Sequence, residues 1–126
     1  MKLIQTPLVS IIIVNYNGRP FLDDCLSSLK KIDYVNIEII LVDNFSSDTS
    51  LDFVKKEYPN IICIELDKNY GFAKPNNLGT KVAKGKYFLF LNNDTIVEPN
   101  FVSELIKIAT KDQTIGILQS LLLKSN

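Results

Sequence analysis

The sequence contains no histidine, and this absence excludes more chemistry than any other feature of its composition. Without an imidazole the chain cannot form a Ser-His-Asp or Cys-His catalytic arrangement, a histidine-ligated zinc site or a histidine-held haem. Any catalysis must therefore depend on carboxylates, amides, lysines, a bound metal or the substrate itself.

Glycine is also scarce, with five residues in the whole chain. No G-x-G-x-x-G pattern follows the first apolar run, and no G-x-x-x-x-G-K-[ST] pattern occurs anywhere. Both patterns cradle phosphates with closely approaching backbone. Their absence disfavours a Rossmann dinucleotide site and a P-loop nucleoside triphosphatase.

The chain has no excess of charge, since 14 basic side chains balance 14 acidic ones. It therefore lacks the positive field that nucleic-acid binding or docking to an anionic membrane requires, and we expect no nucleic-acid partner. No apolar run reaches the ~18 residues of a membrane span, and no signal-peptide core precedes Pro7, so we predict a cytoplasmic protein. Cys25 and Cys63 are predicted to be buried core thiols without a disulfide.

Short runs rich in isoleucine and valine alternate with segments of helical period along the 126 residues, which have the length of one domain. The apolar runs predict strands at 8–14, 37–42, 61–66 and 87–91, and a last strand around 115–118. The intervening segments predict helices at about 20–31, from the capping oxygens of 46–48 to about 58–59, at 72–83 and at about 100–109. Pro75 places the start of the third helix no earlier than about Lys74. This order is typical of an α/β protein with a mainly parallel, doubly wound sheet and helices on both faces.

Each of the first four predicted strands ends in asparagine or aspartate. The polar ends are Asn15 to Asn17, Asp43 and Asn44, Asp67 to Asn69, and Asn92 to Asp94. Parallel strands bring these ends to one edge of the sheet, where ligands bind at the point at which the strand order reverses. The alternative is that these residues only form turns and caps.

An acidic edge of this kind could hold a diphosphate only through a divalent cation, Mg²⁺ or Mn²⁺, and Asp94 is the candidate ligand. Asp43 is suited to a hydrogen bond with a base or sugar, and Tyr16 offers a flat face for stacking. As alternatives, Asp43 caps the next helix and Tyr16 is an ordinary loop aromatic.

Four ordered segments, 9–18, 42–48, 69–79 and 85–95, resemble the family 2 glycosyltransferases of the GT-A fold, especially a rhamnosyltransferase-like branch. The resemblance implies a site for a UDP-, dTDP- or GDP-sugar, with Asp94 as the metal ligand at the end of an element that begins with Asn92 in place of aspartate. The other implied nucleotide-sugar residues are Asn15, Tyr16, Asn17, Asp43, Asn69, Gly71, Asn77, Asn92 and Asn93. The sequence departs from the family pattern at Pro75, where a small residue is common.

The resemblance also implies an acceptor-binding half that supplies the base for inverting transfer, and this chain has no counterpart of it. Asp112 is the only acid after Glu104. We therefore expect residues 1–126 to be a nucleotide-sugar-binding half-domain with an incomplete sheet, the acceptor part missing, and little or no transferase activity alone. In a full-length enzyme we expect a glycan or lipid-linked acceptor and a position at the inner face of the membrane.

Two other functions are compatible with an α/β fold. A non-catalytic binding or assembly module could form a homodimer through an exposed sheet edge and the apolar residues at 117–118 and 121–123. A receiver-like phospho-acceptor domain is disfavoured, because Asn15 and Asn17 stand where paired acids are needed.

Overall fold

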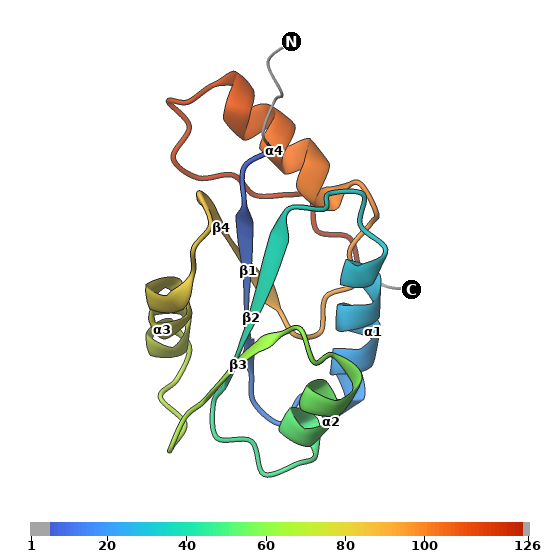
Figure 1. The fold of residues 1–126 in the computed structure, drawn as a ribbon, viewed down its shortest axis with the longest axis vertical. Coiled ribbons are helices and arrows are strands. Elements are labelled where there is room, and N and C mark those ends of the chain that lie inside the picture. The colour runs from blue at the N-terminus through green and yellow to red at the C-terminus, as the bar shows by residue number, and fades with distance from the viewer. Residues whose placement is uncertain (1–5, 125–126) are drawn as a thin grey trace.

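The computed structural model describes residues 6–124, which form four strands and four helices in strict alternation (Figure 1). The elements are β1 (Val9–Asn15), α1 (Arg19–Lys30), β2 (Ile37–Asp43), α2 (Ser50–Glu57), β3 (Ile62–Glu65), α3 (Ala73–Val82), β4 (Tyr87–Asn92) and α4 (Phe101–Lys111). The predicted order of strands and helices is confirmed for these elements.

The strands form one sheet in the order β3-β2-β1-β4, and all neighbours are parallel. The central strand β1 pairs with β2 on one side and β4 on the other, so that Ile12 lies opposite both Ile40 and Phe90. The chain adds β2 and β3 on one side of β1 and then returns to its other side with β4. The strand order therefore reverses between β1 and β4, as in a doubly wound sheet, which confirms the predicted fold class.

Helices cover both faces of the sheet, with α3 on one side and α1 and α2 on the other (Figure 1). On the α1 side the large core contains alternate residues of β1 together with the apolar stripes of the helices. Its buried members include Val9, Ile11, Ile13, Leu22, Cys25, Leu26, Leu29, Leu41, Val54, Leu91 and Val102. On the α3 side a smaller core is built on Ile12, Ile40 and Val42. Because the central strands β1 and β2 are covered on both faces, they read as nearly continuous apolar runs in the sequence.

Helix α3 packs unusually close to the sheet at Gly79. A Cβ atom at this position would lie 2.6 Å from Cγ2 of Ile12 and 3.4 Å from Cγ2 of Val42. The helix lies over β1 and β2 and leaves the same face of the outer strand β4 open, where Phe88 and Phe90 are 47% and 55% exposed. The α3 side of the sheet is thus covered only in part within the described residues.

At the amino edge of the sheet, opposite the predicted site, hydrogen bonds of the buried Ser10 and of the Glu38 carboxylate connect β1 and β2 to the segment before β4. Ser10 Oγ and the Lys84 backbone N–H each donate to Glu38 Oε1 at 2.6 Å, and the Gly85 N–H donates to Ser10 Oγ at 2.8 Å. Burial raises the pKa of Glu38, but the hydrogen bonds from Lys84 and Ser10 outweigh it, so the pKa falls below the ordinary value of 4.5. The ionised carboxylate therefore stabilises this edge.

The prediction of a last strand at 115–118 is wrong. Residues 112–124 contain neither helix nor strand, and Ile117 is 91% exposed. A strand needs backbone partners as well as an apolar run. This segment borders β4 across an apolar groove of about 720 Å³ that α4 also lines, and it does not join the ladder.

Some predicted boundaries and burial states also differ in detail. Helix α3 begins at Ala73, one residue before the predicted limit, because Pro75 lies in its first turn, where a missing N–H costs no helical hydrogen bond. Helix α2 begins at Ser50 with Thr49 as its N-cap, so none of the residues 46–48 predicted to cap it occupies that position. Asp48 lies one residue earlier, and its Oδ1 accepts a hydrogen bond from the Ser50 N–H at 2.9 Å. Both cysteines are free thiols; Cys25 is buried as predicted, whereas Cys63 is half-buried. None of the helices within residues 6–124 has the length and apolarity needed to cross a membrane.

Candidate functional site

The polar strand ends meet at the carboxyl edge of the sheet, as the sequence predicts. Asn15, the last residue of β1, is in register with Asp43 at the end of β2, and Val14 is in register with Asn92 at the end of β4. The three ends that flank the reversal of strand order are therefore neighbours.

Asn15 is completely buried and joins these three ends through its side-chain amide. Its Nδ2 donates to Asp43 Oδ1 at 3.0 Å and to Ser46 Oγ at 3.2 Å. Its Oδ1 accepts a hydrogen bond from Asn93 Nδ2 at 2.9 Å. Asn15 thus lies beneath the edge as part of its framework.

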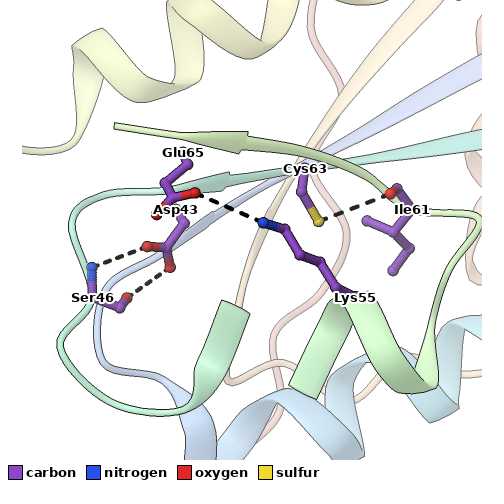
Figure 2. A network of polar contacts seen from close by, with 6 residues as sticks. All are labelled: Asp43, Ser46, Lys55, Ile61, Cys63 and Glu65. Carbon is purple, nitrogen blue, oxygen red and sulfur yellow. Dashed lines mark hydrogen bonds and ion pairs between the residues drawn. The ribbon is translucent and has the colours of Figure 1, made fainter. Parts of the chain in front are cut away.

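Asp43 is only 2% exposed, and its carboxylate is directed at the following loop (Figure 2). Ser46 donates its N–H to Oδ2 at 3.0 Å and its hydroxyl to Oδ1 at 2.7 Å. With the bond from Asn15, Oδ1 accepts twice and Oδ2 once, which leaves one acceptor position on Oδ2 for a further donor. Beside it Lys55 pairs with Glu65 at 3.7 Å, and because both side chains are more than half exposed this ion pair adds little stability.

Asn44 was not among the predicted site residues, yet it organises the loop across the pocket. It is 3% exposed, and its Nδ2 donates to Asn69 Oδ1 at 3.0 Å and to the Gly71 carbonyl at 2.7 Å. Its Oδ1 accepts from the Tyr70 N–H at 2.9 Å. Gly71 has a φ of 79°, which explains why glycine stands there. In the sequence Asn44 appears among the polar strand ends, with no role of its own assigned to it.

Asn17 lies on the far side of the first loop and faces residues 46–48. Its φ is 50°, a conformation that asparagine tolerates, and its Oδ1 accepts from the Ser47 N–H at 2.8 Å. The Asp48 N–H also lies 3.3 Å from the same Oδ1. Burial raises the pKa of the Asp48 carboxyl, but hydrogen bonds from Ser50 and from the Arg19 N–H outweigh burial and lower this pKa below its ordinary value. Asn17 therefore fixes the loop that carries Ser46.

A pocket of about 390 Å³ lies at the reversal point between β1 and β4. It is lined by Val14, Tyr16, Asn44, Asn69, Gly71, Phe72, Asn92, Asn93 and Asp94. Tyr16 is 51% exposed, so its ring is free to contact a ligand. The structure thus brings together most of the predicted residues and adds Val14, Asn44 and Phe72. It places Asn15 and Asp43 beneath the pocket, Asn17 beside it, and Asn77 on the exposed surface of α3.

Asp94 is exposed, and its carboxylate accepts no hydrogen bond from the residues the structure describes. No cluster of three or more acidic or cysteine side chains suited to a metal ion occurs within residues 6–124. The oxygen atoms available at the pocket as metal ligands are therefore those of one free carboxylate and of the neighbouring amides. That set fits a hard cation such as Mg²⁺ or Mn²⁺, which commonly takes one or two carboxylates and completes its shell with water and phosphate oxygens.

The sequence model of the protein family "Glycosyl transferase family 2" matches residues 10–125 of the chain. An uncharacterized glycosyltransferase of Rickettsia prowazekii is 38% identical over 108 residues, which cover 86% of this chain and 34% of that protein. A poly(ribitol-phosphate) beta-glucosyltransferase of Bacillus spizizenii is 41% identical over 98 residues, which cover 71% of this chain and 15% of that protein. The chain thus spans about a third or less of the length of these curated relatives.

Solved structures resemble the chain in the same region. TarS 1-349 of Staphylococcus aureus, in complex with UDP-GlcNAc, superposes with a TM-score of 0.76 at 28% identity, covering 82% of this chain and 31% of that chain. The mannosyltransferase PcManGT of Pyrobaculum calidifontis, in complex with GDP-Man and Mn²⁺, gives a TM-score of 0.82 at 22% identity, covering 90% and 35%. The second likeness shows the GT-A fold alone.

Proposed function

The chain belongs to glycosyl transferase family 2, and on that premise we propose that its pocket binds a nucleoside-diphosphate sugar through a divalent metal. The observation that carries the proposal is the free carboxylate of Asp94 at the rim of a pocket located where the strand order reverses. Tyr16 borders the same pocket with an exposed ring that can stack on the base. Two structures similar to this chain contain UDP-GlcNAc and GDP-Man, the latter with Mn²⁺, which supports this donor class.

The metal would be held by Asp94, with the diphosphate supplying further oxygens. When bound, the cation neutralises the diphosphate and stabilises the charge that develops on it as the sugar leaves. The residues that would hold the nucleoside are Asn69 and Gly71, which border the pocket from one loop, and Asn92, which borders it from the end of β4. Asp43 remains a predicted nucleoside contact through the free position on Oδ2.

For the complete reaction we propose inverting transfer of the sugar to a hydroxyl of a glycan or lipid-linked acceptor on the cytoplasmic side of the membrane. Such transfer needs a carboxylate within hydrogen-bond reach of the acceptor hydroxyl. Asp94 would be occupied by the metal, Asp43 is buried, and Asp112 lies in the segment after α4, where Thr114 donates to it at 2.6 Å. We therefore expect residues 1–126 alone to catalyse little transfer.

Calorimetry of the chain with UDP, dTDP and GDP, with and without Mn²⁺, tests the donor site. We expect at least one nucleotide to bind, and Mn²⁺ to strengthen its binding. Asp94→Asn should reduce the Mn²⁺-dependent gain by about tenfold or more, since even outer contacts of metal ligands have effects of that size. Asp24→Asn, an exposed substitution on α1, is the matched control and should bind as the unaltered chain does. Failure of folded protein to bind any of the three with Mn²⁺ refutes the proposal.

A second candidate function is self-association without catalysis. The outer edge of β4 pairs with no strand among the described residues, and Phe88 and Phe90 beside it are exposed. An unpaired edge with apolar neighbours favours the addition of a second copy. Sedimentation velocity that gives a monomer at all accessible concentrations contradicts this function, and nucleotide binding by that monomer favours the first.

A further inference from the structure

We infer that the hydrogen bond between the side chains of Asn15 and Asn93 sets the position of the turn that carries Asp94. Asn15 and Asn93 are then positioning residues, and of these three side chains only that of Asp94 contacts the metal. This inference rests on the proposed metal-assisted binding of a nucleotide sugar, and it deepens that proposal by assigning to Asn93 a role other than contact with the ligand.

The Asn15 amide can face in only one direction. Its neighbour Asp43 is a carboxylate that only accepts hydrogen bonds, so the Nδ2 group of Asn15 must point toward Asp43, 3.0 Å away. The Oδ1 of Asn15 is thereby directed at the end of β4, where it accepts from Asn93 Nδ2 at 2.9 Å. The buried carboxylate of Asp43 at the end of β2 thus determines that the Oδ1 atom of Asn15, and not its Nδ2 atom, faces Asn93 after β4.

Gly18 provides a second, independent observation. A Cβ atom on Gly18 would lie 2.2 Å from Asn93 Nδ2 and 2.3 Å from Asn15 Oδ1, closer than any side chain can approach. The backbone before α1 therefore covers the hydrogen bond directly, and glycine is required because no space is left for a larger residue. The loop after β1 holds the two amides in one arrangement.

The turn is anchored at its ends, where Asn92 pairs with Val14 of β1 and the Val97 N–H donates to Ser28 Oγ at 3.1 Å, and it has few other attachments between them. The Thr95 N–H donates to the Asn92 carbonyl at 3.2 Å, and the Cys25 thiol makes a long contact of 3.7 Å with the same carbonyl. The Asp94 carboxylate has no hydrogen-bond donor among the described residues. Its position is therefore determined by the backbone of the turn, which the Asn93 side chain fastens to β1.

Calorimetry with UDP as the probe, with and without Mn²⁺, separates positioning from direct contact. In Asn93→Ala we expect metal-free binding within about twofold of the unaltered chain and the Mn²⁺-dependent gain reduced about three- to tenfold, the range for one lost hydrogen bond. Gly18→Ala should reduce the same gain without removing either amide. Asn100→Ala is the matched control, because that exposed residue makes no side-chain capping bond to α4.

Two results overturn the inference in folded protein. One is an unchanged Mn²⁺-dependent gain in both variants, and the other is an equal loss of metal-free binding in Asn93→Ala, which indicates direct contact. Nuclear magnetic resonance relaxation of the backbone amides of residues 92–95 tests the positioning without any ligand. Greater mobility at Asp94 in Asn93→Ala supports it, and unchanged mobility refutes it. If the unaltered chain does not bind UDP with Mn²⁺ while this mobility change is seen, the donor proposal fails for UDP and the structural role of the bond stands.

Discussion

Gly79→Ala tests how closely α3 packs on the sheet, because two opposing effects of known size meet at this residue. Alanine is a better helix former than glycine in a helix interior, by about 1 kcal/mol. Its Cβ atom, however, would lie 2.6 Å from Cγ2 of Ile12, a side chain that is fully buried in the centre of the sheet. The sign of the stability change shows which effect is larger.

We expect the steric effect to be larger. Ile12 is a β-branched side chain on a strand that is paired on both sides, so it has little freedom to move away. Inserting a methyl group into a packed core typically costs about 1–3 kcal/mol. After the gain in helix propensity, the net loss in the free energy of unfolding is about 1 kcal/mol, which lowers Tm by about 3–5 °C for a domain of this size.

Urea unfolding followed by circular dichroism measures this change, with an unchanged denaturant slope as the sign that the two-state comparison is valid. Gly116→Ala is the matched control, since no atom lies within 4 Å of a Cβ at that position. In the double variant with Ile12→Ala the two losses should not add, because the clashing methyl groups are gone. Stabilisation of about 1 kcal/mol by Gly79→Ala would refute the close contact between α3 and β1.

Three further predictions concern other parts of the fold. Glu38→Gln should lower the free energy of unfolding by about 1 kcal/mol, since charge-assisted hydrogen bonds are stronger than neutral ones. Because the folded pKa of Glu38 is lowered, this difference should be complete above the ordinary value of 4.5 and disappear as the pH falls through the folded pKa, which urea unfolding over a pH series measures. Ser28→Ala should cost about 1–3 kcal/mol in the same assay at neutral pH, because the buried hydroxyl accepts the Val97 N–H at 3.1 Å and the variant leaves that donor unpaired; an equal stability of the two proteins would contradict this bond. Burial raises the pKa of Cys25 to about 11, so iodoacetamide should label the half-buried Cys63 first and Cys25 only on unfolding. Peptide mass spectrometry measures the two labelling rates, and equal rates in native protein would contradict this prediction.

The sheet could be predicted because its local signals agree with its tertiary contacts. The run from Val9 to Val14 is apolar except for Ser10, since both faces of β1 are covered, and such a run is readable without knowledge of the partners. The run at 115–118 has the same local character and forms no strand. Pairing depends on which segment reaches the open edge of β4, and no local pattern contains that information.

The site could be predicted as a location but not in its internal roles. The polar strand ends indicated the correct edge, because parallel strands must end together. The sequence could not show that Asn44 would hold the loop at 69–71, since that role depends on contacts across 25 to 27 residues. The Asn15–Asn93 bond joins residues 78 positions apart and is equally invisible to local patterns.

Asp43 and Asp94 show why residue type alone does not define the chemistry of this edge. Asp43 ends β2 and Asp94 follows β4, the two strands on either side of β1. The first is buried and bonded to Asn15 and Ser46, whereas the second is exposed and accepts no hydrogen bond from the described residues. Apart from the Tyr16 hydroxyl, the other polar side chains at the pocket are the amides of Asn44, Asn69, Asn92 and Asn93, which carry no charge. Under the proposed function, carboxylates in place of these amides would add repulsion to a diphosphate, so amides around one carboxylate that can take a divalent cation favour its binding.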